Sequence, residues 1–407
     1  MKPTRVLALA GAITLVVSAC AGQQATQRPS VAAPSVAVPA TQAPSVAPAT
    51  ATAPTATHSA PAATPSGAAA TPTSVAASPS AQAAQCDGQH INFMLSFLAN
   101  IQHAGFLIAK QEGYYEDEGL DVEIVPAGPG IDVTQAVADG TADLGQIDYV
   151  PLVEARNENV PVKAVAQIYK DPFFFWYSAK DGGPATVAEW DGKRVGQIQV
   201  GQYPERDAIM LKAGIDPDSI RPVPQEFDGL LDPDKMDIAE GVVFFHPALI
   251  NIIGAMGTFP DDFNVFRPAE LGADFASQTV AGSESYLADN ADAVACFLRA
   301  SIRGWQAAFD DPQLAVDSTM AFVPEGSPIT PDHQMAALPD VLEIVGTGSD
   351  DDTLLQPDPA SYQSTVQQLI DVGAIDEGDI PDIADTYDAS FYEAATGNTV
   401  PLPSATP

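Results

Sequence analysis

The residues that most often carry out chemistry in proteins are few in this chain and lie far apart in its sequence. The five histidines occupy positions 58, 90, 103, 246 and 333, a spacing that offers no recognisable metal site. Neither the H-E-x-x-H pattern of zinc hydrolases nor the G-x-S-x-G turn of serine hydrolases occurs. We therefore expect no catalytic residue, no metal and no cofactor.

Polar and aromatic side chains instead follow predicted strands at the point where each strand ends. Asn100 and His103 follow an apolar strand predicted at 91–95, and Tyr149 follows a strand predicted at 144–147. Open α/β sheets bind ligands at this carboxyl edge, where the amino ends of the next helices offer free N–H groups. These three residues are therefore candidate ligand contacts, although a helix-capping role is the alternative for His103.

A run of five aromatic residues occupies positions 173–177. Successive side chains of a strand point to opposite faces, so Phe174 and Trp176 share one face and the other three aromatic residues share the opposite face. One set can fill the core while the other stands in a cleft, and we take Phe174 and Trp176 as candidate ligand contacts. Packing of both faces into the core is the alternative.

Helix and strand patterns alternate around these candidates. Apolar residues recur at helical spacing over 104–108, alternate with acidic residues over 120–124, and recur at helical spacing over 133–137, before the strand at 144–147. Helix, strand, helix and strand within about forty residues is typical of a doubly wound α/β lobe.

The segments H-A-G-F-L-I-A-K-Q-E-G-Y-Y-E-D-E-G-L-D-V-E-I-V-P-A-G-P-G at 103–130 and A-D-G-T-A-D-L-G at 138–145 resemble a known family. They are similar to the opening of NMT1/THI5-like solute-binding proteins, which feed ABC importers, and the resemblance continues more weakly to about Gly397. It implies an α/β, two-lobe periplasmic-binding-protein type II fold, with doubly wound sheets joined by a hinge.

The second lobe is expected to open at W-D-G-K-R-V-G, 190–196, which resembles the family's L-x-G-K-x-V-G signature. By this resemblance Gln202 and Tyr203 follow the lobe's first strand, Phe245 and His246 follow a later strand, and all four face the first lobe as candidate ligand contacts. Relatives often carry Tyr-Asn-Glu where this chain has F-F-H at 244–246. A neutral histidine offers one donor and one acceptor, whereas a carboxylate accepts two hydrogen bonds, so the ligand of a given relative does not transfer directly.

The amino-terminal region has the pattern of an export signal followed by a tether. Residues 1–19 combine two basic residues with a short apolar run, and V-S-A-C at 17–20 resembles a bacterial lipobox whose Cys20 is acylated, with ordinary secretion as the alternative. Residues 20–85, rich in Ala, Pro, Ser and Thr, predict a disordered tether with a mean span of roughly 45 Å. The regions expected beyond it are lobe 1 at 86–178, lobe 2 at 179–265, a return to lobe 1 with carboxyl-terminal helices at 266–397, and a disordered tail at 398–407.

Two cysteines remain after Cys20, namely Cys86 and Cys296. Two cysteines that remain in an exported chain favour a disulfide between them, and a free, buried Cys296 is the alternative.

The formal net charge of −36 excludes nucleic acid as a partner, since two polyanions repel.

The resemblance implies a monomeric lipoprotein on the extracytoplasmic face of the cell membrane, in contact with the membrane only through its lipid. Its expected partners are a small-molecule ligand and the permease and ATPase subunits of an ABC transporter. The aromatic candidates favour a flat, uncharged N-heterocycle, which within the family points to riboflavin or a thiamine pyrimidine precursor. Alkanesulfonate or nitrate binding is an alternative that requires cations such as Lys163, Arg206 and Arg221, and a ligand sensor without transport is another.

Overall fold

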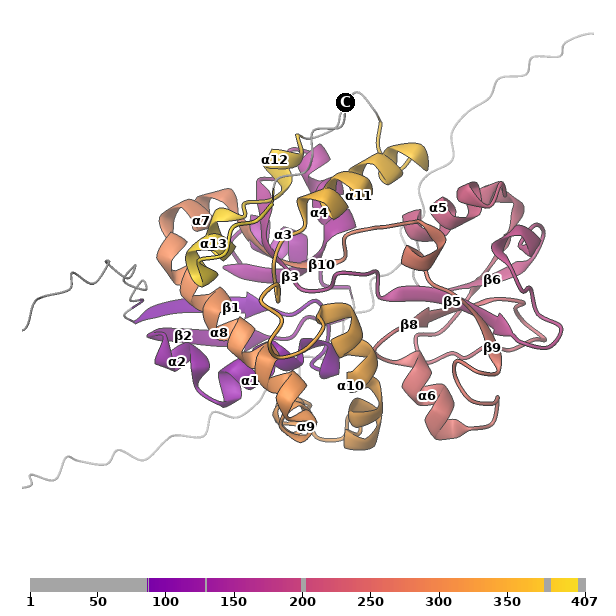
Figure 1. Cartoon of the computed structure of the whole chain (residues 1–407), viewed down its shortest axis with the longest axis horizontal. Helices are drawn as coiled ribbons and strands as arrows, with labels where there is room; N and C mark the ends of the chain where they lie inside the picture. The colour runs from indigo at the N-terminus through magenta and orange to yellow at the C-terminus, as the bar shows by residue number, and fades with distance from the viewer. Residues whose placement is uncertain (1–85, 87, 129, 199–202, 377–381, 402–407) are drawn as a thin grey trace, which may run out of the picture. The chain divides into compact units, whose positions relative to one another are not determined.

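The computed structural model of the chain (Figure 1) describes residues 86, 88–128, 130–198, 203–376 and 382–401. All of them belong to one compact unit, 76–407. The predicted signal peptide at 1–19, the tether at 20–85 with its lipidation residue Cys20, and the candidate contact Gln202 lie outside the described residues, as do 402–407 of the predicted tail.

A mixed five-stranded sheet forms the first lobe, with the strand order β2-β1-β3-β10-β4. Strand β1 runs parallel to β2 and β3, whereas β10 runs antiparallel to β3 and β4. The five strands are β1 (Gln89–Met94), β2 (Leu120–Val125), β3 (Leu144–Asp148), β4 (Val162–Gln167) and β10 (Gln278–Ser283). The predicted alternation is present in β2, where Leu120 and Val122 are buried and Asp121 and Glu123 are exposed.

The helices of this lobe come from both ends of the described chain, because the chain leaves the first sheet after β4 and returns at β10 (Figure 1). The early helices are η1 (Ile101–His103), α1 (Ala104–Gln111), α2 (Tyr114–Asp117), α3 (Val133–Ala138) and α4 (Tyr149–Asn157). The late helices are α7 (Glu284–Asp289), α8 (Ala291–Asp310), α9 (Pro312–Met320), α10 (Pro331–Val345), α11 (Pro359–Asp371), α12 (Ile383–Thr386) and α13 (Ser390–Thr396).

The longest described helix, α8, packs directly on α1. Two glycines permit the close crossing: a β-carbon at Gly304 would overlap the carbonyl oxygen of Gly105, and a β-carbon at Gly105 would overlap the ring of Trp305. Trp305 is fully buried at this crossing. The contact joins the two ends of the described chain into one lobe.

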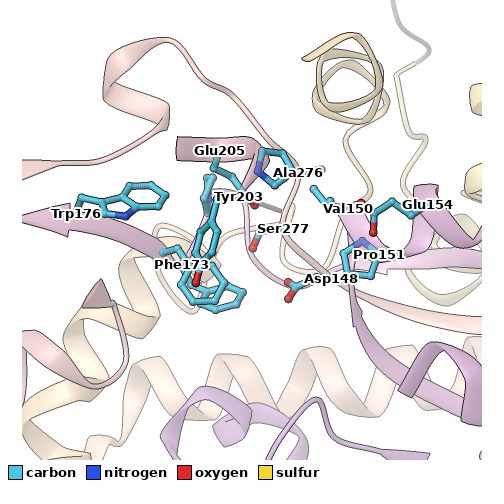
Figure 2. A pocket seen from close by; sticks show the side chains of 13 residues that line it. Asp148, Val150, Pro151, Glu154, Phe173, Trp176, Tyr203, Glu205, Ala276 and Ser277 are labelled. Carbon is cyan, nitrogen blue, oxygen red and sulfur yellow. The ribbon is translucent and has the colours of Figure 1, made fainter. Parts of the chain in front are cut away.

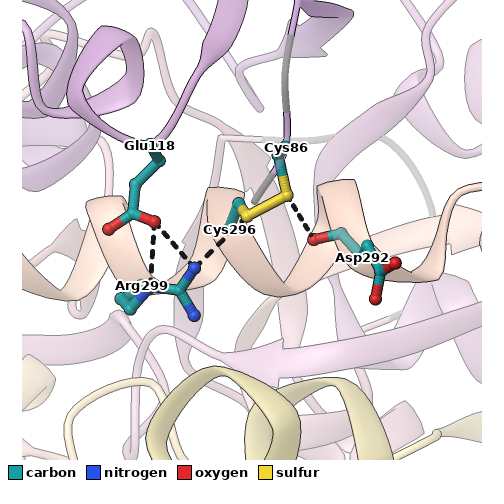
Figure 3. The surroundings of a disulfide bond; sticks show 5 residues. All are labelled: Cys86, Glu118, Asp292, Cys296 and Arg299. Carbon is teal, nitrogen blue, oxygen red and sulfur yellow. Dashed lines mark hydrogen bonds and ion pairs between the residues drawn. A yellow bond between two sulfur atoms is a disulfide. The ribbon is translucent and has the colours of Figure 1, made fainter. Parts of the chain in front are cut away.

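A disulfide joins Cys86, which is the first described residue, to Cys296 on α8 (Figure 3). The sequence left this bond open against a free, buried Cys296, and the structure has the bond. Beside it, the guanidinium of Arg299 pairs with the carboxylate of Glu118 at 2.7 Å. The start of the folded region is thereby fixed to the central helix of lobe 1.

The second lobe consists of an antiparallel sheet, β8-β5-β9, and a parallel pair, β6-β7, linked by a bridge between Val195 and Ile238. The strands are β5 (Phe174–Ala179), β6 (Arg194–Gln197), β7 (Arg221–Pro224), β8 (Ala239–Val242) and β9 (Phe263–Phe266). The helices are η2 (Val187–Glu189), α5 (Pro204–Lys212), η3 (Pro217–Ser219), α6 (His246–Ile253) and η4 (Ala269–Leu271).

One boundary differs from the sequence prediction. Strand β5 was expected at the end of lobe 1, within 86–178, but it pairs with β8 and β9 and so belongs to lobe 2. The chain crosses between Gln167 and Phe174, and returns between Phe266 and Gln278. The aromatic run therefore begins at the crossing itself. Among the described residues, no helix is long and apolar enough to span a membrane.

Candidate functional site

A cavity of about 440 Å³ lies where the two lobes meet (Figure 2). Small-molecule sites have volumes of roughly 300–1,000 Å³, so this cavity can hold a small organic ligand. Its described lining residues come from the β3–α4 junction, the β4–β5 crossing, the amino end of α5 and the segment before β10: Asp148, Val150, Pro151, Glu154, Pro172, Phe173, Phe174, Trp176, Tyr203, Pro204, Glu205, Ala276 and Ser277.

Asp148 forms the turn from β3 into α4 and contributes to the lobe 1 side of the cavity. It occupies the N-cap position in extended conformation, but its carboxylate does not bond the N–H groups of the helix. The next residue donates its N–H to the carbonyl of Ser277 at 3.1 Å, which ties the junction to the segment before β10. The Asp148 carboxyl therefore lies at the cavity wall and makes no capping hydrogen bond to α4 (Figure 2).

The aromatic side of the cavity comes from the crossing between the lobes. Phe173 and Phe174 pack with ring centroids 4.2 Å apart, and Trp176 meets Trp190 edge-on at 6.4 Å. Phe175, on the opposite face of the strand, packs in the core on Phe259. Phe174 and Trp176 thus line the cavity, whereas Phe173, which the strand period placed on the face of Phe175, also lines the cavity because it precedes the strand.

The amino end of α5 closes the cavity from lobe 2. Tyr203 is the N-cap residue and Pro204 occupies the first turn, where its missing N–H costs nothing. Glu205 follows in that first turn, where the helix dipole favours an acidic residue. Arg206 pairs with Asp207 at 2.6 Å, and its guanidinium lies 4.9 Å from the centre of the Tyr203 ring.

Three carboxyl groups line this cavity, and burial disfavours their ionised forms. Burial, and then the charge of Glu205, raises the pKa of Asp148 to about 8. Burial raises the pKa of Glu205 to about 7, with further contributions from the charges of Glu154 and Asp207. Burial and the charge of Glu158 raise the pKa of Glu154 as well. The cavity is thus acidic and holds protons near neutral pH.

The described lining residues include no lysine or arginine. The three cations proposed from the sequence are placed elsewhere: Lys163 lies 3.6 Å from Glu284, Arg206 pairs with its neighbour on α5, and Arg221 is exposed on β7. The described wall therefore offers no cationic side chain to an anion.

Of the nine candidate contacts predicted from the sequence, Phe174, Trp176 and Tyr203 line this cavity together. Their role in ligand binding stays a prediction. Gln202 directly precedes Tyr203 but lies outside the described residues.

Tyr149 is a correction to the sequence prediction, which placed it over the ligand edge. It is fully buried and stacks on Tyr362 of α11, with ring centroids 4.1 Å apart and planes 16° from parallel. Its hydroxyl shares a 2.5 Å hydrogen bond with Thr386. The ring turns inward because a late helix supplies its partner, and Tyr149 serves the core.

Asn100 and His103 also differ from their predicted placement, since neither lines the cavity. Asn100 caps η1, accepting from the N–H of Gln102 at 2.9 Å. His103 is fully buried, its Nδ1 donates to Gln146 Oε1 at 2.6 Å, and burial lowers its pKa to about 3. It occupies the N-cap position of α1 without a side-chain capping bond. Both residues organise the interior of lobe 1.

Phe245 and His246 lie at the start of α6 and are likewise absent from the cavity lining. His246 is fully buried, its Nδ1 accepts from the N–H of Val242 at 3.0 Å, and burial lowers its pKa to about 4. Phe245 packs between Phe227 and His333, whose ring centres lie 4.8 Å away in each case. The neutral imidazole of His246 closes a turn within lobe 2.

Sequence reasoning missed the carboxyl groups of Asp148, Glu154 and Glu205. Asp148 has the position of a helix cap, Glu154 has no local signal, and Glu205 has only its position in the first turn of α5. The available signals were Pro151 and Pro204. A proline in the first turn marks the start of a helix, and these two helices start at the carboxyl ends of strands.

Comparison with known proteins adds sequence relatives to this geometry. The family described as NMT1/THI5 like matches residues 100–315. The riboflavin-binding protein RibY of Chloroflexus aurantiacus is 28% identical over 268 residues, covering 60% of this chain and 69% of RibY. A formylaminopyrimidine-binding protein of Halalkalibacterium halodurans is 25% identical over 234 residues, 56% of this chain and 68% of the relative. A 4-amino-5-hydroxymethyl-2-methylpyrimidine phosphate synthase of Aspergillus parasiticus is 24% identical over 248 residues, 59% and 72% respectively.

Solved structures share the fold at low sequence identity. A putative periplasmic sulfonate-binding protein, SsuA, of Methylobacillus flagellatus aligns with 79% of this chain and 100% of its own, with a TM-score of 0.56 and 11% identity. The periplasmic nitrate-binding protein NrtA of Synechocystis aligns with 78% and 91%, with a TM-score of 0.55 and 13% identity. The fold is therefore that of the periplasmic binding proteins, as the sequence predicted. Relatives by sequence include both binding proteins and enzymes, and this chain belongs to the NMT1/THI5-like family.

Proposed function

We propose that this protein captures a flat N-heterocyclic nutrient outside the cytoplasm and delivers it to an ABC importer as the importer's solute-binding component. The observation that carries this proposal is the cavity between the lobes, whose wall combines Phe173, Phe174, Trp176 and Tyr203 with three carboxyl groups. Riboflavin or a thiamine pyrimidine precursor is the proposed class of ligand, in keeping with the names of two of the relatives.

The cavity wall suits a planar ring for a physical reason. Aromatic pairs contribute about 0.5–1.5 kcal/mol beyond the area they bury, and they orient a ring as well as hold it. The aromatic residues come from the crossing, from β5 and from the amino end of α5, so a ring held between them lies on the lobe 2 side and faces the lobe 1 wall at Asp148. Closure of the lobes around a ligand is the usual way in which such proteins sequester it from water.

Sulfonate or nitrate binding is less well supported. An anion binds where several N–H groups or cations converge. The described lining residues offer three carboxyl groups and no cation, so the wall gives an anion no favourable charge and repels it as the carboxyls ionise. The similarity to SsuA and NrtA extends to the fold, so it does not carry their ligands over.

Binding without catalysis is the other part of the proposal, because some relatives are named as pyrimidine synthases. Both cysteines within the described residues are joined in one disulfide, which leaves no thiol there for metal binding or nucleophilic attack. We also propose that Cys20 carries a lipid anchor and that the protein acts as a monomer. A sensor without a transport partner is the alternative, and the presence or absence of co-purifying permease distinguishes the two.

The direct test is to identify the molecule that the purified full-length protein carries. Mass spectrometry of the ligand released by denaturation should find an intact planar N-heterocycle, and added riboflavin or aminopyrimidine should quench the fluorescence of Trp176. Phe174→Ala should weaken this binding roughly tenfold, the loss of about one stacking contact. Phe309→Ala is the matched control, because Phe309 is also a half-buried phenylalanine but lies on α8, away from the cavity. A chemically altered product, or tight binding of sulfonates alone, would refute the proposal.

A further inference from the structure

We propose that the ligand of this cavity carries a positive charge, which Asp148 of lobe 1 and Glu205 of lobe 2 bind while the aromatic side chains contact its flat faces (Figure 2). This inference rests on the proposed function, because it concerns the ligand of the same cavity. It revises the sequence-based expectation of an uncharged ring, and of the two ligand classes proposed above it favours an aminopyrimidine that carries a proton over riboflavin, which is uncharged.

The first argument is the distribution of charge around the cavity. Asp148, Glu154 and Glu205 come from α4 and α5, on different lobes, and all three line the space. The charge of Glu205 acts on Asp148, and that of Glu154 acts on Glu205. Carboxylates gathered in a half-buried wall without a cation are unfavourable, so these groups hold protons unless a bound cation compensates their charge.

The second argument is the aromatic lining, which favours an organic cation over a metal ion. Cations are attracted to the faces of Trp, Tyr and Phe rings, and quaternary or protonated nitrogen is commonly recognised by rings of this kind. Arg206 already lies over Tyr203, which shows that the ring accepts a cation. Hard metal ions prefer six or more oxygen ligands, and the described residues contain no group of side chains that could hold a metal ion.

A third observation is the indole of Trp176. This side chain lines the cavity, is fully buried, and its Nε1 has no hydrogen-bond partner among the described residues. A buried N–H without an acceptor costs free energy. A ligand that places a ring nitrogen or carbonyl oxygen beside it would satisfy this donor, so we expect the cation to carry an acceptor as well.

Other titratable groups around the two carboxyls do not reverse this charge. Asp207 and Glu240 lie near Glu205 and add negative charge, and Arg206 is the one described cation among these neighbours, already paired with Asp207. Glu240 accepts a 2.6 Å hydrogen bond from the N–H of Ile198 and also bonds Tyr203. The groups that face Asp148 and Glu205 are Glu154, Tyr169, Tyr203, Arg206, Asp207 and Glu240.

The charge of the ligand determines the sign of its pH dependence. Without ligand the pKa values of Asp148 and Glu205 are about 8 and about 7, so both sites are partly protonated near neutral pH. A bound cation favours the ionised carboxylates and releases these protons, so its affinity rises as the pH rises through this window. An uncharged ligand gains nothing from ionisation, and an anion loses affinity.

The test compares three planar bicyclic probes that differ in charge: N-methylquinolinium, quinoline and naphthalenesulfonate. Isothermal titration of the full-length protein should show that N-methylquinolinium binds most tightly and gains affinity between about pH 6 and about pH 8.5, by at most roughly tenfold per unit for each proton released. Proton release should appear directly when the titration is repeated in buffers with different ionisation enthalpies.

Variants then assign the effect to the two carboxyls. Asp148→Asn and Glu205→Gln should each weaken N-methylquinolinium binding roughly tenfold to a hundredfold and flatten its pH dependence, while quinoline binding changes little. Asparagine is a good helix N-cap, so Asp148→Asn preserves the turn into α4. Asp181→Asn is the matched control, since Asp181 is exposed in the turn after β5 and does not line the cavity.

The outcomes separate this inference from the proposed function. If quinoline binds as tightly as N-methylquinolinium at high pH, and neither variant separates the two probes, the ligand is uncharged and only the charge assignment fails. If none of the probes binds, or if Phe174→Ala leaves their binding unchanged, the cavity does not capture planar rings and both proposals fail.

Discussion

Replacement of Asp148 by asparagine should stabilise the ligand-free protein at high pH and leave its stability almost unchanged at low pH. The folded state raises the pKa of this carboxyl to about 8, chiefly by burial. An unfolded chain has an aspartate pKa of about 3.9. Between these values the folded state binds more protons than the unfolded state, so the free energy of unfolding falls as the pH rises. Asparagine does not ionise, so the variant avoids this loss.

The size of the effect follows from the difference between the two pKa values. A pH of 7 lies about three units above the pKa of an unfolded aspartate. Each unit lowers the free energy of unfolding by about 1.36 kcal/mol, so the full effect is roughly 4 kcal/mol. The side chain is only half-buried and faces the water of the cavity, which screens part of this cost. We therefore expect the variant to gain about 1–2 kcal/mol of stability at high pH.

Thermal unfolding of the dialysed protein at about pH 4.5 and about pH 8 measures this difference. For a chain of this size about 1 kcal/mol moves the unfolding midpoint by roughly 2–4 °C, so the variant should melt several degrees above the wild type at the higher pH only. An effect of the asparagine amide that does not depend on ionisation changes the unfolding midpoint equally at both pH values. It therefore cancels when the two differences between variant and wild type are compared. Asp181→Asn should show no such change. A gap between Asp148→Asn and wild type that is the same at both pH values would refute the burial argument for this carboxyl.

Two further changes test the ends of the folded region and the proposed anchor. The double substitution Cys86→Ala with Cys296→Ala removes a crosslink between residues 210 positions apart, and loop entropy sets an upper bound of about 5 kcal/mol on the loss, which calorimetry should report as a lower unfolding midpoint. A midpoint equal to that of the oxidised wild type would mean that the bond does not constrain the unfolded chain. Cys20→Ala should move the protein from the membrane fraction to the culture fluid or periplasm, and retention in the membrane would rule out a lipid on Cys20.

The parts of the fold that could be predicted are those determined by short-range pattern. The alternation of apolar and acidic residues expected at 120–124 lies in β2, Leu120–Val125, because a strand that is buried on one face requires a two-residue period. The two-residue period of the aromatic run separated Phe174 and Trp176 from Phe175 and Tyr177, since a strand allows no other distribution. Local geometry alone fixed these outcomes.

Side chains whose partners lie far along the chain could not be placed in this way. Tyr149 faces inward because Tyr362, more than two hundred positions later, packs on its ring. His103 is held by Gln146, which in turn donates to Gln278 on the returning strand β10. The sequence shows that these residues follow strands, but not that a late helix or strand covers them. Whether a residue at a strand end faces the core or the cavity therefore depends on its tertiary contacts, which the sequence pattern does not show.

The sequence did not reveal the acidic wall of the cavity, for a different reason. The chain has 53 acidic residues, so residue type alone could not distinguish Asp148 and Glu205 from the many carboxylates on the surface. They are 57 positions apart by their numbering (205 − 148), and one carboxyl acts on the other only because the starts of α4 and α5 line the same cavity. The net charge excluded nucleic acid as a partner, and only the structure shows that three of the carboxyl groups line the cavity.

The position of these carboxyls on different lobes connects the charge of the ligand to its capture. Like charges that face one another across a cavity oppose the approach of the two walls, more so as the pH rises and the carboxyls ionise. A cation between them reverses the sign of this interaction and contributes free energy only when both walls are in reach. An uncharged ring would have to bring the lobes together by stacking alone, against that repulsion. The pH dependence of binding and the pH dependence of stability thus report on the same two side chains, and they must change together in Asp148→Asn if the ligand is the cation that we propose.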